Sequence, residues 1–183
     1  MLRNVLKKLF THESQNIANL AGEIEAIESA IELCANCSGR IIITGIGKSG
    51  VAARKIAGTL TSIGYPAIFL HPTEALHGEL GVLSTDDIVI CISKSGRTEE
   101  LETLIAEFKR WGLPIIAITA DRESPLAVNS DIVIFISCTS EGDPLGIIPT
   151  TSVVCSIAVG DAIASGIVHL KNITRQQFRA HHP

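Results

Sequence analysis

The strongest constraint on the fold is an alternation between short apolar runs and longer segments with helical periodicity. Strands that are apolar at every position are typical of a parallel sheet, because its crossover connections place helices on both faces. We therefore expect an α/β fold, a doubly wound three-layer αβα sandwich around a five-stranded parallel sheet. The expected strands are 40–44, 67–70, 88–92, 114–119 and 132–136.

The remaining segments carry helix signals. Apolar residues recur at three- and four-residue steps from Arg3 to Asn36, which predicts two helices broken near Gly22. We expect one domain, with a helical segment 1–38, an α/β core 39–170 and a tail 171–183. Further helices are expected at 49–63, 98–111, 124–127 and 150–169, the last with N-cap oxygens from Thr150, Thr151 and Ser152.

Composition excludes several classes of function. The formal net charge is −4 and 4% of the 183 residues are aromatic, so neither a basic face nor a base-stacking platform for nucleic acid is expected. The longest apolar stretch, 153–170, contains Asp161 and several Ser residues. We expect a buried core helix there and no contact with a membrane.

The cysteines and the start of the chain indicate a cytoplasmic protein. Five cysteines are an odd number, and the first ten residues lack the apolar run of a signal peptide. The Cys34-x-x-Cys37 pair has no second pair at zinc spacing. We expect reduced thiols and no metal.

The first expected strand leads into a glycine-rich turn, Gly45-Ile46-Gly47-Lys48-Ser49-Gly50. This turn matches G-x-G-x-x-G, but the next strand ends in His-Pro and lacks the acidic residue that a dinucleotide site needs. It is not a P-loop either, because Ile42 stands where that motif has Gly. Backbone N–H groups, Lys48 and the Ser49 hydroxyl at a helix start still favour an anion.

The third expected strand leads into Ser93-Lys94-Ser95-Gly96-Arg97-Thr98. Three hydroxyls, a glycine and a helix start within six residues suit a phosphate monoester. An ordinary Ser/Thr-rich helix cap would look similar. Because two such loops follow the first and third strands, we favour phosphate binding.

Two later segments carry groups for acid–base chemistry. His77 and Glu79 follow the second strand, and Glu141 and Asp143 follow the fifth. A buried carboxylate or histidine at the ligand edge can move a proton. His77 and Glu79 lack a further histidine at metal-ligand spacing, so no metal is expected there.

From about Ile17 to Pro183, the motifs GxGKSG, HPxEAxHGELG, ISxSGxTxE and PLGxxPTTS occur in order. This series resembles the sugar isomerase (SIS) domain and, within it, the arabinose 5-phosphate isomerases. The resemblance implies a flavodoxin-like sheet and interconversion of D-ribulose 5-phosphate and D-arabinose 5-phosphate through an enediol, without a cofactor. It also implies a homotetramer in which neighbouring subunits complete each site.

The resemblance also implies roles for particular residues. Gly45, Gly47 and Gly96 shape the substrate loops, and Ser93, Ser95 and Thr98 bind the phosphate with Ser49 nearby. Glu141 or Glu100 is the expected base, and Lys48 steadies the enediolate oxygen. His77 and the tail residue His182 are candidates for ring opening or proton relay, with His182 acting on a neighbour's site. The implied catalytic set is thus Lys48, Glu100, Glu141, His182 and His77.

The sequence departs from the family pattern at three points. Arg97 stands where Glu is frequent, and Asp143 where Cys is common. The chain also ends at Pro183, before the Gly-Gly segment and the paired CBS domains of typical arabinose 5-phosphate isomerases. Two alternatives remain: isomerisation of another phosphosugar, or a non-catalytic sensor of a sugar phosphate. A sensor would need the Ser/Thr loop but not the full acid–base set.

Overall fold

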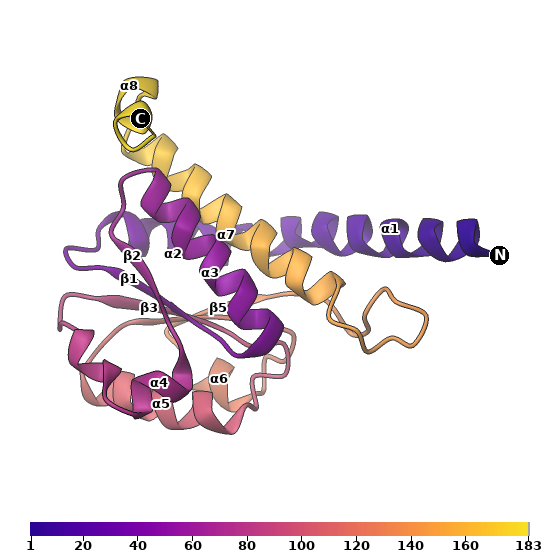
Figure 1. Cartoon of the computed structure of the whole chain (residues 1–183), viewed down its shortest axis with the longest axis horizontal. Helices are drawn as coiled ribbons and strands as arrows, with labels where there is room; N and C mark the ends of the chain where they lie inside the picture. Colours follow the sequence, from indigo (N-terminus) through magenta and orange to yellow (C-terminus); the bar gives the residue numbers. More distant parts are fainter. Residues whose placement is uncertain (183) are drawn as a thin grey trace.

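A five-stranded, all-parallel sheet forms the middle layer of the protein (Figure 1). The structure is a computed structural model, and it describes residues 1–182. The strand order is β2-β1-β3-β4-β5, which is the doubly wound arrangement expected from the sequence. The strands are β1 (Ile41–Thr44), β2 (Ala67–Leu70), β3 (Ile88–Ile92), β4 (Ile115–Thr119) and β5 (Ile132–Phe135).

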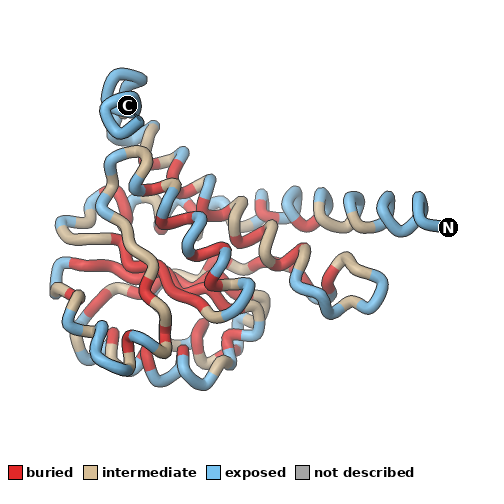
Figure 2. Tube along the Cα trace, viewed as in Figure 1, coloured by how far each residue is buried: buried red, intermediate tan, exposed pale blue. Residues whose placement is uncertain are grey.

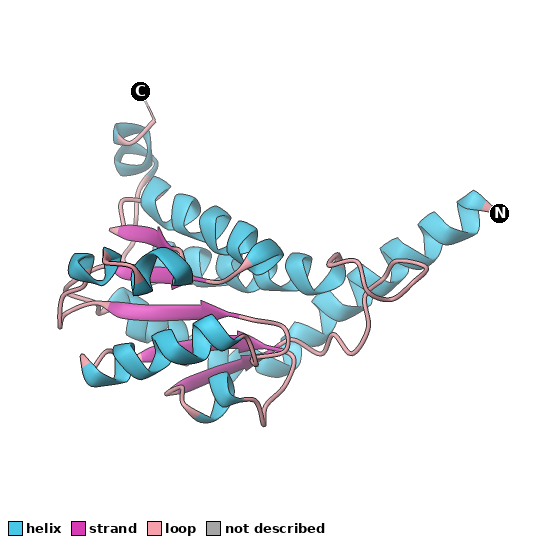
Figure 3. Cartoon of the chain, turned by 60° about the horizontal axis from the view of Figure 1, so that its bottom comes forward, coloured by secondary structure: helices cyan, strands magenta, loops and turns pink. Residues whose placement is uncertain are grey.

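Helices cover both faces of the sheet (Figure 3). Helices α2 (Ile24–Ala35), α3 (Gly47–Ser62) and α7 (Thr151–Leu170) form one layer. Helices α4 (Pro72–Leu76), α5 (Glu99–Arg110) and α6 (Pro125–Val128) form the other. The three-layer αβα expectation is therefore confirmed.

Each strand contributes side chains to the apolar cores on both faces of the sheet, because successive side chains point to opposite faces. On β1, Ile41 and Ile43 pack against the α2/α3/α7 layer, whereas Ile42 packs against the α4/α5/α6 layer. Strand β3 alternates in the same way, and all five of its residues are buried. Burial of such a side chain stabilises the fold by about 1.5–3 kcal/mol, which is why these strands are mainly apolar.

Helix α7 is long and apolar, and one of its faces lies in the protein core. Its mean hydropathy of 1.8 and its 20 residues meet the length and composition criteria for a membrane span. Its buried face nevertheless packs against α2 and α3. This placement agrees with the expectation of a core helix.

Helix α1 (Leu2–Asn19) extends from the body of the molecule (Figure 1), and its outer half is exposed along its length (Figure 2). A short 3-10 turn, η1 (Leu20–Glu23), separates it from α2. The expected break near Gly22 is therefore present, and it separates a projecting helix from a packed one.

Three segments differ from the sequence expectation. The turn after β2 contains α4 and a 3-10 turn, η2 (Glu79–Val82), where only a loop was expected. The tail contains helix α8 (Arg175–Ala180), which begins with a capping box between Thr174 and Gln177. That local signal was missed because the segment lacks an apolar period. Pro183 lies outside the described residues.

Candidate active site

The Ser/Thr loop between β3 and α5 is tightly organised. The Ser93 hydroxyl accepts a hydrogen bond from the Gly96 N–H at 3.1 Å and pairs with the Thr98 hydroxyl at 3.2 Å. The Ser95 hydroxyl accepts from the Arg97 N–H at 3.3 Å. Gly96 has φ +61°, and a Cβ there would lie 2.1 Å from the Ser124 Oγ. Only glycine therefore fits this turn, and the three hydroxyls expected to bind phosphate lie in one loop.

The glycine-rich loop after β1 lies beside the Ser/Thr loop, because β1 and β3 are neighbours in the sheet. A Cβ on Gly45 would lie 2.9 Å from the Ile92 carbonyl oxygen at the end of β3. Gly47 begins α3 with φ +59°, followed by the exposed Lys48 and the half-buried Ser49. The topological switch of a doubly wound sheet falls between these two strands, so both loops occupy the edge where ligands bind.

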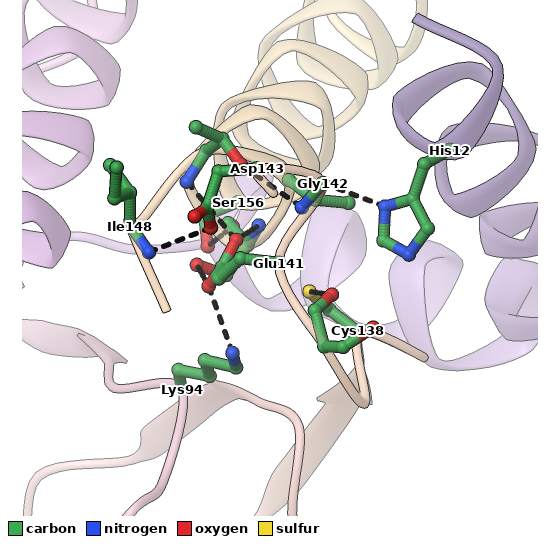
Figure 4. A network of polar contacts seen from close by, with 12 residues as sticks. His12, Lys94, Cys138, Glu141, Gly142, Asp143, Ile148 and Ser156 are labelled. Atoms are coloured by element: carbon green, nitrogen blue, oxygen red, sulfur yellow. Dashed lines mark hydrogen bonds and ion pairs between the residues drawn. The ribbon is translucent and has the colours of Figure 1, made fainter. Parts of the chain in front are cut away.

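Glu141 is the centre of a polar network that joins three segments (Figure 4). Its Oε1 accepts from the Lys94 Nζ at 2.9 Å and from the Ser152 Oγ at 2.6 Å. Its Oε2 accepts from the Thr150 and Ser152 N–H groups at 3.0 and 3.1 Å. The side chain is only 2% exposed. Both oxygens of the carboxylate thus accept two hydrogen bonds each.

This network holds Glu141 in its ionised form. Burial by itself would raise its pKa, but the bonds from Ser152, Lys94 and Thr150 outweigh that effect and lower the pKa from 4.5 to about 2. The carboxylate therefore carries a negative charge at neutral pH in this conformation.

The start of α7 corrects one sequence expectation. The hydroxyls of Thr150, Thr151 and Ser152 were expected to cap this helix, but no side-chain cap bond comes from the N-cap residue Thr150. The Thr150 hydroxyl accepts from the Gly142 N–H instead. The Glu141 carboxylate binds the first helical N–H groups, where the helix dipole also favours a negative charge.

A cavity of about 520 Å³ lies between α1 and the segment that carries Glu141. The His12 Nδ1 lies 3.0 Å from the Thr151 Oγ1 and links α1 to the start of α7. The sequence reasoning assigned no role to His12, which lies in no motif. The lining residues are Lys7, Lys8, Thr11, His12, Gln15, Asn16, Glu141 and Gly142.

The other expected catalytic residues are less closely grouped. Glu100 is exposed in the first turn of α5, and His77 lies directly after α4, where it is also exposed. His182 follows α8, where its ring stacks on that of Phe178 with centroids 4.1 Å apart. Glu141 caps the opposite end of α7, a helix about 30 Å long. Within one chain, the structure therefore does not bring His182 to the other site residues.

The two departures within the motifs have structural partners. The Arg97 guanidinium binds the Asp121 carboxylate at 2.8 Å. Hydrogen bonding from the Glu123 N–H and from Arg97 lowers the pKa of Asp121. Asp143 accepts from the Leu145 and Ile148 N–H groups, both at 2.8 Å. Both side chains thus organise loops beside the site.

The cysteines and possible metal ligands add no further chemistry to the site. All five cysteines are free, and burial raises the pKa of Cys34 to about 12, so its thiol is neutral. Within residues 1–182, no cluster of three or more His, Cys, Asp and Glu side chains is placed to hold a metal ion.

The sequence reasoning missed the partnership between Lys94 and Glu141. Lys94 stands between Ser93 and Ser95, and this position in the loop was the only signal available. Its partner is 47 residues away in the chain.

Known proteins resemble this chain over most of its length. A sequence model of the SIS domain matches residues 35–166. The arabinose 5-phosphate isomerase KpsF of Escherichia coli O6:H1 is 37% identical over 180 residues, covering 97% of this chain. This chain spans 55% of the length of that relative.

Several solved structures match the whole chain, two of them as follows. The protein c3406 of E. coli CFT073, in complex with arabinose 5-phosphate, is 36% identical with a TM-score of 0.92, and the match covers 97% of that chain. A candidate sugar-phosphate isomerase from Listeria monocytogenes is also 36% identical, with a TM-score of 0.94 and 96% of that chain covered. The fold, the ordered motifs and these matches together show that the chain belongs to the SIS domain family.

Proposed function

We propose that this protein is an aldose–ketose isomerase that interconverts D-ribulose 5-phosphate and D-arabinose 5-phosphate through an enediol. The observation that carries the proposal is that one buried, ionised carboxylate, Glu141, contacts the loop whose hydroxyls suit a phosphate. A base held beside a phosphate anchor can reach a carbon-bound proton of a phosphosugar whose phosphate that anchor fixes. The relatives named for arabinose 5-phosphate support the choice of sugar.

Each residue then has a part in the reaction. Ser93, Ser95 and Thr98 bind the phosphate, with the N–H groups at the start of α5. Glu141 takes the proton from C2 of the aldose and returns it to C1 of the ketose. Lys48, exposed on the neighbouring loop, stabilises the negative oxygen of the enediolate. Glu100 is the alternative base.

We further propose that the sites are shared between subunits of a homotetramer. His182 lies beyond the far end of α7 from Glu141, so only a second subunit can bring such a histidine to this site. His77 and His182 then supply ring opening or proton relay. The five free thiols are consistent with a cytoplasmic location.

The exposed face of α1 supports an oligomer. Leu2, Val5, Leu6, Leu9 and Phe10 recur at the spacing of one helix face. Four of them are exposed: Leu2 by 71%, Val5 by 36%, Leu6 by 44% and Phe10 by 65%. A projecting helix with such a face gains stability mainly by packing against a partner. A second copy of this chain is the partner proposed.

The test is proton exchange followed by NMR in heavy water with D-arabinose 5-phosphate. We expect deuterium at C2 together with ribulose 5-phosphate. Glu141→Gln should reduce turnover by about 10²-fold or more while leaving sugar-phosphate binding in place. If the unmodified protein gave neither deuterium at C2 nor ribulose 5-phosphate, but its melting temperature rose on adding the sugar phosphate, the result would favour a non-catalytic sensor. Near-normal turnover in the variant would make Glu100 the base.

A further inference from the structure

The four hydrogen bonds to Glu141 differ in origin. Three come from the start of α7: two backbone N–H groups and the buried Ser152 hydroxyl. The fourth comes from Lys94, on a different element. A carboxylate has about four lone-pair positions, and here all are used, so a substrate proton has no free position to enter. One of the four donors has to leave before Glu141 can act as a base.

Lys94 is the donor that can leave at least cost. Its backbone is fixed, because its carbonyl oxygen accepts from the Ala120 N–H at 2.9 Å and from the Thr119 Oγ1 at 3.2 Å. Its side chain is 36% exposed and ends in a flexible ammonium group. The other three donors are less mobile: the Ser152 hydroxyl is buried, and the two N–H groups belong to the backbone of the N-cap residue Thr150 and of the first turn of α7.

Lys94 also belongs to the loop that suits a phosphate. It lies directly between Ser93 and Ser95, whose hydroxyls are two of the three in that loop. A phosphate monoester carries about −1.5 to −2 charge at pH 7, which exceeds the single charge of the carboxylate. An ammonium group carried by the loop that binds the phosphate is therefore expected to be drawn toward it.

We propose that Lys94 is a positioning residue that couples phosphate binding to the release of Glu141. In the free protein its ammonium occupies Oε1 of Glu141. When a sugar phosphate enters the loop, the ammonium moves to the phosphate and leaves Oε1 free to receive the substrate proton. The inference rests on the proposed function, and it adds a link between the anchor and the base that excludes substrates without phosphate.

Other ionisable groups near Glu141 do not replace Lys94. The thiols of Cys138 and Cys155 are neutral, since burial, with a smaller effect of nearby charges, raises the pKa of each to about 11. Asp143 is engaged by backbone N–H groups of its own loop. Three further ionisable groups line the cavity on the α1 side, namely Lys7, Lys8 and His12. Within residues 1–182, no hydrogen bond joins any of them to the Glu141 carboxylate.

The kinetic test compares two pH profiles in Lys94→Met, Lys94→Arg and the unmodified enzyme. The profile of kcat/KM reports the free enzyme, and that of kcat reports the substrate complex. In the unmodified enzyme the acid limb of kcat should lie about one pH unit or more above that of kcat/KM, because Glu141 loses a cation on binding.

In Lys94→Met the two limbs should coincide, and kcat/KM should fall about ten-fold or more. Lys94→Arg should keep the limbs apart. The control is Lys109→Met, an exposed lysine at the far end of α5 that binds Asn129, and it should behave as the unmodified enzyme. Limbs that coincide in the unmodified enzyme, or stay apart in Lys94→Met, would overturn the proposal.

A crystallographic test needs no turnover, so it separates this inference from the isomerase assignment. Crystals grown with and without inorganic phosphate should differ at Lys94. With phosphate in the Ser93–Thr98 loop, the Lys94 Nζ should lie within hydrogen-bond distance of a phosphate oxygen and no longer contact Glu141. An intact contact with Glu141 beside a bound phosphate, or phosphate bound away from this loop, would refute the inference. An inactive protein that shows the movement would instead refute only the isomerase assignment.

Discussion

At the scale of single residues, Glu141 combines a structural role with the proposed catalytic one. Its carboxylate caps α7, fixes the Lys94 side chain and is the proposed base. A base with four donors is weakly basic, and for that reason its activation needs a change that accompanies substrate binding. The same hydrogen bonds contribute to the stability of the fold. The stability of the protein should therefore depend on the ionisation of Glu141 at acid pH.

Glu141 should make stability depend on pH. Its pKa in the folded protein, about 2, lies below its ordinary value of 4.5. A lowered pKa means that the contribution is complete above about pH 4.5 and is lost as the pH falls toward 2. We expect the urea midpoint of the unmodified protein to fall between about pH 6 and about pH 3 more steeply than that of Glu141→Gln.

The control for this experiment is Glu102→Gln, at an exposed position on α5. It should keep the slope of the unmodified protein. Equal slopes for Glu141→Gln and the unmodified protein would show that Glu141 is not held ionised by its network.

At the scale of elements, the α3/α7 contact depends on glycine. A Cβ on Gly160 of α7 would lie 2.3 Å from the Cγ1 of Ile56, a fully buried residue of α3. Gly166 meets Ile31 of α2 in the same way. Glycines in α7 therefore let its backbone approach the helices on both sides, and this approach builds one of the two layers on the sheet.

Gly160→Ala should destabilise the protein although alanine favours helix. Forcing a methyl group against Ile56 should cost about 1–3 kcal/mol, measured as the change in the free energy of unfolding in urea. Gly58→Ala in α3 is the matched control: nothing lies within 4 Å of its added Cβ, so it should stabilise by about 0.5–1 kcal/mol. Adding Ile56→Val to Gly160→Ala should recover part of the loss. A Gly160→Ala protein as stable as Gly58→Ala would contradict this account of the packing.

At the scale of the whole molecule, the two ends of α7 separate parts that the proposed mechanism brings together. Glu141 lies at its first turn, and His182 lies beyond its last. The projecting α1 leaves an apolar face without a partner among residues 1–182. Both features are what the subunits of an assembly with shared sites would show.

Shared sites predict complementation between two inactive variants. Glu141→Gln and His182→Ala should each be nearly inactive alone. Co-expressed in equal amounts, they should recover about a quarter of normal activity, because about a quarter of mixed sites take an intact residue from each of two subunits. The measurement is isomerase activity of mixed oligomers isolated with two different tags. No recovery in isolated mixed oligomers would show that each site takes both residues from one chain, whereas normal activity of His182→Ala alone would place His182 outside the mechanism.

The sheet, and the position of both candidate substrate loops at one edge of it, could be predicted because their signals are local. The expected strands agree with the structure to within one residue at each end, since every strand position is buried or half-buried and nearly all are apolar, Thr44 and Thr119 excepted. Hydroxyls and glycines that follow a strand are placed at the ligand edge by the parallel topology alone. The resemblance then supplied the sugar and the candidate catalytic set.

Contacts between distant segments could be decided only by the tertiary structure. Lys94 and Glu141 are 47 residues apart, and their contact depends on how the β3–α5 loop and the β5–α7 segment meet at the edge of the sheet. The choice of Glu141 over Thr150 as the cap of α7, and the distance between Glu141 and His182, have the same origin. A sequence pattern reports what each residue prefers locally, whereas partners across the chain are selected by the packing of whole elements. The fold therefore determined which carboxylate is buried, charged and in contact with Lys94.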